Sequence, residues 1–190
     1  MIIPSYYKKL KSMPDDPPMS EVFLAIADSF QCFLKIYPIP EKYLMPLNTS
    51  EIIDGIHQNL DETQGLIECD IRKTNTGGNA VYSIIKNKMH PSGVQYFLRM
   101  HVMNERGNFE IDLFADEKGL TGWRDTSVYE LLMRKNKGIR VDGWNKDPYD
   151  SNYKKGFLMN LSEDKRFDEL FKNHPLSEIR RMVEFFINNN

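Results

Sequence analysis

Only two cysteines, Cys32 and Cys69, occur among the 190 residues. Each stands in apolar, strand-like surroundings, where a free thiol behaves as a small hydrophobic side chain. No histidine lies at a zinc-ligand spacing from either cysteine. The sequence therefore predicts no metal site and no cofactor, and we expect the protein to reside in the reducing cytoplasm.

An excess of one charge is also missing, because 25 basic residues stand against 27 acidic ones and the net charge is -2. Nucleic-acid-binding proteins usually carry a clustered basic excess. The nearest approach to one is the run Arg134, Lys135, Lys137 and Arg140, which we interpret as cations at a helix C-terminus. We therefore expect no nucleic-acid partner.

Long hydrophobic runs are absent as well. No apolar stretch approaches the roughly 20 residues that a membrane-spanning helix needs. Residues 1–20 lack the basic and then apolar order of a signal peptide. We expect no membrane partner.

The length fits one α+β domain of ordinary size. Four prolines among residues 1–19 favour an extended N-terminal arm. Residues 20–138 are predicted to form a core of sheet and helices. Residues 139–190 are predicted to form an aromatic-rich loop followed by two C-terminal helices.

Strand patterns are concentrated between Leu66 and Ala115, which reads as four consecutive antiparallel strands. Residues 94–103 alternate strictly between apolar and mainly polar side chains, the period of a half-buried strand. A hairpin turn that ends at Gly107 places Leu98 opposite Leu113 on the apolar side. On the other side the same register pairs Arg99 with Asp112 and His101 with Glu110, and opposite charges across a ladder favour that register.

The turn at residues 90–93 is predicted to place Ile85 near Leu98 and Val81 near Val102 on the buried face. That register leaves Tyr82, Ile84, Phe97 and Phe114 on the opposite, outer face of the sheet. One-sided burial is common in antiparallel sheets.

The elements around these strands are less uniform in their signals. Residues 21–37 fit a hairpin, with strands at 21–27 and 32–37, or a helix, and we favour the hairpin, which makes a central sheet of about six strands. One helix is predicted from a cap at residues 48–50 to about Asp61, and another from Asp125 or Ser127 to Gly138. The two final helices are predicted to begin at Asn160 or Ser162 and at Pro175.

The order of elements over residues 21–138, a strand pair, a helix, four strands and a helix, resembles the PsbP-like α/β/α sandwich. That group includes photosystem lumenal proteins, a Ran-binding import factor and the Eag-type chaperones of bacterial secretion effectors. The segments 64–68, 92–96 and 119–125 are also similar to those of uncharacterised bacterial proteins. The resemblance implies a bias toward binding other proteins, although a fold does not determine a function.

The outer face of the sheet supplies the candidate site. Its predicted partner-binding residues are Tyr82, Ile84, Phe97, Arg99, His101, Glu110, Asp112 and Phe114. Aromatic side chains dominate protein interfaces, and flat sheet surfaces seldom exclude water as catalytic pockets do. We therefore predict a non-enzymatic protein-binding module, such as a bacterial cytoplasmic adaptor or a secretion-associated chaperone.

Three alternatives remain open at this point. His101, with Glu110 and Arg99, could serve a small hydrolase-like enzyme as its general base and anion-binding group. Within the binding class, an immunity protein fits equally well. Finally, a second aromatic group, Trp123, Trp144, Tyr149 and Tyr153, could form the partner-binding patch, or the two C-terminal helices could fold over the outer face and bury it.

Overall fold

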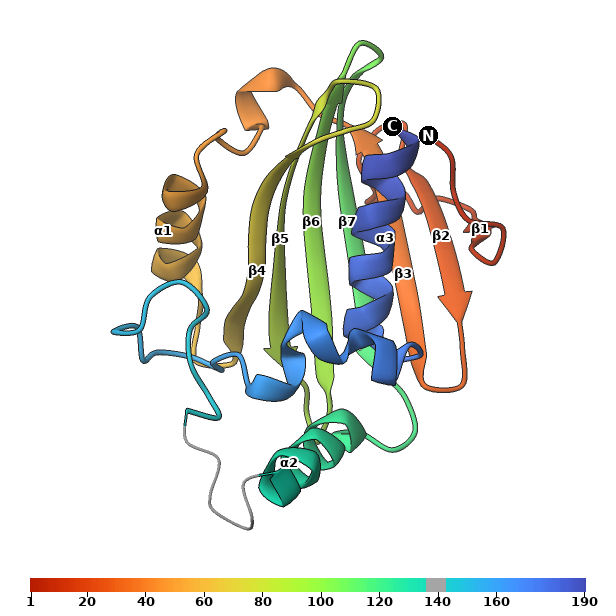
Figure 1. Cartoon of the computed structure of the whole chain (residues 1–190). Coiled ribbons are helices and arrows are strands. Elements are labelled where there is room, and N and C mark those ends of the chain that lie inside the picture. The colour runs from red at the N-terminus through yellow and green to blue at the C-terminus, as the bar shows by residue number, and fades with distance from the viewer. Residues whose placement is uncertain (136–142) are drawn as a thin grey trace.

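The computed structural model describes residues 1–135 and 143–190. Within these residues, seven strands form one open antiparallel sheet in the order β1-β2-β3-β7-β6-β5-β4, and helices lie on both of its faces (Figure 1). The α+β class is therefore as predicted, with one strand more than expected. The strands are β1 (Lys8–Leu10), β2 (Glu21–Ile26), β3 (Phe30–Pro38), β4 (Gln64–Lys73), β5 (Asn79–Lys88), β6 (Val94–Asn104) and β7 (Gly107–Glu117).

The helical elements are three α-helices and three short 3₁₀ helices in the described part of the chain. They are α1 (Thr49–Asn59), α2 (Trp123–Lys135), α3 (Pro175–Asn189), η1 (Glu41–Tyr43), η2 (Leu161–Glu163) and η3 (Lys165–Phe171). The helix predicted from Asn160 is thus two 3₁₀ helices. The predicted end of the second helix at Gly138, together with Lys137 and Arg140 of the basic run, lies outside the described residues.

The hairpin of β6 and β7 has the predicted register. Leu98 pairs with Leu113, and Arg99 pairs with Asp112. Both leucines are fully buried, while Arg99 lies on the opposite face. Gly107 has a φ of +124°, a backbone conformation that glycine adopts without a steric cost.

Residues 21–37 form a hairpin, as favoured, and the helical interpretation of this segment is wrong. β2 and β3 pair in antiparallel fashion. On its other side β3 pairs with β7, and Phe33 lies opposite Phe114. The predicted N-terminal arm contributes the extra strand, because β1 pairs with β2. Tyr7 of the arm is buried and donates a hydrogen bond of 3.1 Å to Glu178 of α3.

The predicted face of β5 is wrong by one residue relative to β6. The connection from β5 to β6 holds five residues instead of four, since Lys88 pairs with Val94, and Ile84 is therefore the partner of Leu98. A slip of one residue moves every side chain of a strand to the opposite face. Tyr82 consequently lies in the core. Val81, which was expected on the same face as Leu98, packs on the α1 side of the sheet instead.

α3 covers one face of the sheet, and α1 covers part of the other (Figure 1). The predicted stripe of α3, which includes Leu176, Ile179, Val183 and Phe186, is buried against β3, β6 and β7. His174 caps this helix by accepting a hydrogen bond from the Leu176 N–H. α1 begins after the predicted cap, Asn48, and buries Ile52 against β4 and β5.

Buried charges connect η2 to the sheet and to α2. The ammonium group of Lys86 donates to Glu163 Oε2 at 2.8 Å, and the Tyr96 hydroxyl donates to Oε1 of the same carboxylate at 3.0 Å. Arg124 is also fully buried and donates to the Ser162 carbonyl at 2.7 Å. Among the described residues, no buried side-chain nitrogen or oxygen lacks a hydrogen-bond partner, as burial of charge requires.

A helix that crosses a membrane needs about 20 predominantly apolar residues. Of the helices in the part of the chain that the structure describes, none is both long and apolar enough to cross a membrane.

The buried pair of Lys86 and Glu163 predicts a large stability effect. Lys86→Met leaves the Glu163 carboxylate buried without its cation, so we expect the free energy of unfolding in urea to fall by about 3–5 kcal/mol. Lys9→Met removes one partner of an exposed pair with Glu21 and should cost less than about 1 kcal/mol. Equal losses in the two variants would contradict this account of the buried network.

Candidate protein-binding groove

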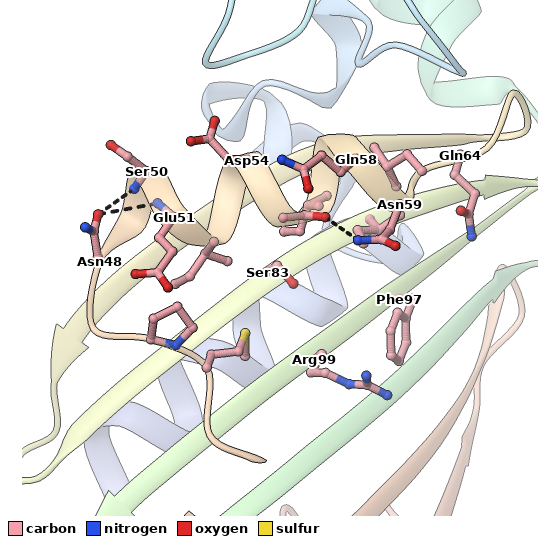
Figure 2. Close-up of a pocket in the computed structure, with 17 residues that line it drawn as sticks. Asn48, Ser50, Glu51, Asp54, Gln58, Asn59, Gln64, Ser83, Phe97 and Arg99 are labelled. Carbon is pink, nitrogen blue, oxygen red and sulfur yellow. Dashed lines mark hydrogen bonds between the residues drawn. The ribbon is translucent and has the colours of Figure 1, made fainter. Parts of the chain in front are cut away.

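A groove of about 960 Å³ lies between α1 and the outer face of the sheet. Its floor is formed by Ser83 and Ile85 from β5 and by Phe97 and Arg99 from β6, while α1 forms one wall (Figure 2). Neighbouring strands place paired residues side by side, so the floor consists of two cross-strand pairs. Ile85 and Phe97 form its apolar level, and Ser83 and Arg99 form its polar level.

The apolar level continues across the sheet beyond the groove. The strand pairings align Phe33 of β3, Phe114 of β7, Phe97 of β6 and Ile85 of β5 in one row. The rings of Phe97 and Phe114 stack at 4.6 Å between centroids. These side chains are partly exposed, so the row is an aromatic surface that lies open beside α1.

The polar level is organised by Arg99. Its Nε and Nη2 donate to the two oxygens of Asp112 at 3.0 and 3.2 Å, a bidentate pairing that fixes the guanidinium plane. The guanidinium also lies 5.3 Å from the centre of the Phe97 ring. The side chain is still 46% exposed, so the paired guanidinium forms part of the groove surface.

His101 is held by hydrogen bonds on both ring nitrogens. The backbone N–H of Met45 donates to Nδ1 at 2.8 Å, and Nε2 lies 3.0 Å from Glu110 Oε2. Because Nδ1 accepts, this pattern assigns the proton of the neutral ring to Nε2, which donates to the carboxylate. The side chain is buried, and no nitrogen is left to take a proton from a substrate.

Glu110 is similarly engaged. Besides His101, it accepts a hydrogen bond of 2.5 Å from the Tyr37 hydroxyl and lies 3.1 Å from Arg99 Nε. Burial by itself raises the pKa of Glu110, but the hydrogen bonds from His101 and Tyr37 and the charge of Arg99 outweigh it, so the pKa lies below its ordinary value of 4.5. The carboxylate therefore stays ionised as a structural acceptor.

The α1 wall brings acidic side chains to the groove. Glu51 and Asp54 both line it and are exposed. In Figure 2 the Glu51 carboxylate lies on the side of α1 that faces the sheet. Within the described residues neither carboxylate forms an ion pair with a cation.

The structure brings together six of the eight predicted site residues on the outer face. They are Phe97, Arg99, His101, Glu110, Asp112 and Phe114. The other two, Tyr82 and Ile84, face α3 and are buried, and the Tyr82 hydroxyl donates to Glu68. This correction follows from the five-residue connection, which turns β5 over and places Ser83 and Ile85 in the groove.

Sequence reasoning missed the residues that come from other elements. Phe33 belonged to a segment with two interpretations, and Glu51 lies on a helix whose position on the sheet the sequence did not give. The alternation of Phe33, Lys35 and Tyr37 was the available signal. The possibility that the C-terminal helices bury the outer face is excluded, because α3 lies on the opposite face (Figure 1).

The residues from 144 to 157 cover the edge of the sheet at β4. The Tyr149 hydroxyl donates to the Cys69 carbonyl at 3.0 Å and accepts from its N–H at 2.6 Å. His57 of α1 stacks on Tyr153 at 4.0 Å and lies 2.9 Å from Asp147. Tyr149 and Tyr153 thus contact the rest of the protein, although Tyr149 is still 42% exposed, and Trp123 is 59% exposed.

The two cysteine thiols are both free and buried. Burial, followed by the nearby Asp70 and Glu68 carboxylates, raises the pKa of Cys69 to about 11. Burial also raises the pKa of Cys32, to about 12. Both thiols are therefore protonated at neutral pH and poorly reactive.

No protein-family model and no curated protein matches the sequence. Among solved structures, the fold resembles PA94 from Pseudomonas aeruginosa, a protein of unknown function, with a TM-score of 0.39 and 11% identity over 72% of this chain and 97% of PA94. It also resembles the PsbP protein of Synechocystis sp. PCC 6803, with a TM-score of 0.39 and 15% identity over 70% of this chain and 81% of that one. The predicted PsbP-like resemblance is thus present and concerns the arrangement of elements alone.

The low pKa of Glu110 predicts an acid-dependent contribution to stability. A carboxyl whose pKa is lower in the folded state stabilises the fold above its unfolded value, and this contribution is lost as the pH falls through the folded pKa. We expect the free energy of unfolding to decrease more steeply below about pH 4.5 in the wild type than in Glu110→Gln. Urea titrations between pH 7 and pH 2.5 measure both slopes, and identical slopes would contradict the assignment.

Proposed function

We propose that the protein is a non-enzymatic binding module that holds a partner protein on the outer face of its sheet. The observation that carries this proposal is the aromatic row of Phe33, Phe114 and Phe97, which opens directly into the groove beside α1. Exposed aromatic clusters bordered by polar groups are typical of protein interfaces. A bacterial adaptor or secretion-associated chaperone fits this description.

The chemistry of the groove supports binding over catalysis. A general base needs a nitrogen or oxygen that is free to accept a proton from the substrate. His101 uses Nδ1 to accept from Met45 and Nε2 to donate to Glu110. Arg99 is likewise committed to Asp112, so the charged groups act as a rigid floor.

A reducing cytoplasm is the compartment that we propose for this module. The two free, buried cysteines support it, since thiols persist where disulfides are rare.

The proposal predicts that partner capture depends on the aromatic row. We expect Phe97→Ala/Phe114→Ala to lose at least nine-tenths of the partner recovered by affinity purification from the native host, because truncation removes the apolar anchor. Trp123→Ala is the matched control, since it truncates an aromatic residue that is 59% exposed on α2, outside the groove.

Circular dichroism and thermal unfolding should show that each variant is folded at the temperature of the purification. Recovery that is unchanged in the Phe97→Ala/Phe114→Ala variant, or equally reduced by Trp123→Ala, would overturn the assignment of this face.

A further inference from the structure

We propose that the partner segment bound in the groove is an amphipathic helix with an apolar stripe and lysine or arginine residues that face α1. This inference rests on the proposed function and specifies the chemistry of the partner. Three features of the groove lead to it: the backbone pairing of the floor, the space beside α1, and the charge of the wall.

The floor favours a helix because it offers only side chains. β5, β6 and β7 are each paired with strands on both sides, so their backbone N–H and C=O groups are already used. An extended segment laid on this face would bury its own backbone groups without partners, at a cost of roughly 1–3 kcal/mol for each group. A helix satisfies its backbone internally.

Strand addition at the nearby edge is blocked as well. The Tyr149 hydroxyl occupies both backbone groups of Cys69 in β4. The Gln64 carbonyl, at the start of the same strand, accepts from the Phe157 N–H at 2.7 Å. A partner strand therefore cannot form backbone hydrogen bonds with these groups of Cys69 and Gln64 in β4.

The space suits a helix that lies beside α1. On the opposite face, α3 covers β3, β6 and β7 (Figure 1). The same three strands carry the uncovered part of the aromatic row on the α1 side. A second helix there would lie beside α1, which spans 11 residues or about 16 Å, and its apolar stripe would pack on Phe97 and Phe114.

The charge of the groove favours a basic partner. Arg99 contributes one positive charge, but Glu110 and Asp112, which contact it, contribute two negative charges. Glu51 and Asp54 add two more on the wall and form no ion pair within the described residues. Because these four carboxylates outnumber the single guanidinium around the groove, a lysine or arginine on the helix gains attraction, and an acidic residue is repelled.

The test uses two synthetic 18-residue helical peptides that share one leucine stripe and carry lysine or glutamate elsewhere. We expect the lysine peptide to bind the wild-type protein at least tenfold more tightly than the glutamate peptide, as measured by fluorescence anisotropy. Glu51→Lys/Asp54→Lys should weaken the lysine peptide at least tenfold and strengthen the glutamate peptide. Phe97→Ala/Phe114→Ala should weaken the lysine peptide to a similar degree.

The matched control is Asp28→Lys/Glu105→Lys. It changes the net charge by the same amount at two exposed turn residues that do not line the groove, and it should alter the affinity of the lysine peptide by less than twofold. Equal weakening by the control, or tight binding of both peptides, would show that the attraction is nonspecific and would overturn the inference.

The native partner separates this inference from the proposed function. Capture that is lost in Phe97→Ala/Phe114→Ala and also in Glu51→Lys/Asp54→Lys supports both. Capture that is lost only in the phenylalanine variant overturns the basic helix and leaves the binding face intact. Capture that survives the phenylalanine variant overturns the binding face itself.

Discussion

The pairing of β6 with β7 is the constraint on which the rest of the structure depends. Successive side chains of a strand point to opposite faces, so the register that joins Leu98 to Leu113 also joins Arg99 to Asp112. The first pair belongs to the core beneath α3, and the second belongs to the groove beside α1. A single register therefore sets the stable interior and the candidate binding surface together.

The two faces of the sheet are covered unequally. α3 buries most of its apolar stripe over the central strands, and the buried ion pair of Lys86 and Glu163 connects η2 to the same face. α1 is shorter and lies toward β4. Because α3 covers one face of the sheet and the shorter α1 covers only part of the other, the aromatic row of Phe33, Phe114 and Phe97 is left exposed.

The polar floor of the groove is arranged before any partner binds. Tyr37, His101 and Arg99 all direct donors to Glu110 or Asp112. A partner therefore meets side chains whose conformations are already fixed, and little conformational entropy remains to be lost in the floor. The same hydrogen bonds occupy both ring nitrogens of His101.

Local patterns in the sequence determined the hairpin of β6 and β7, the start of α1 after a cap at residues 48–50, and the start of α3 at Pro175, because each depends on residues close to one another in the chain. The sequence could not decide the face of β5. Turns of four and five residues both fit His90 to Gly93 and its neighbours, and the difference moved Tyr82 and Ile84 into the core. Nor could it say that Glu51 and Arg99 line the same groove. That juxtaposition comes from which face each helix covers, and helix placement is decided by the packing of distant apolar surfaces, which leaves no local signature.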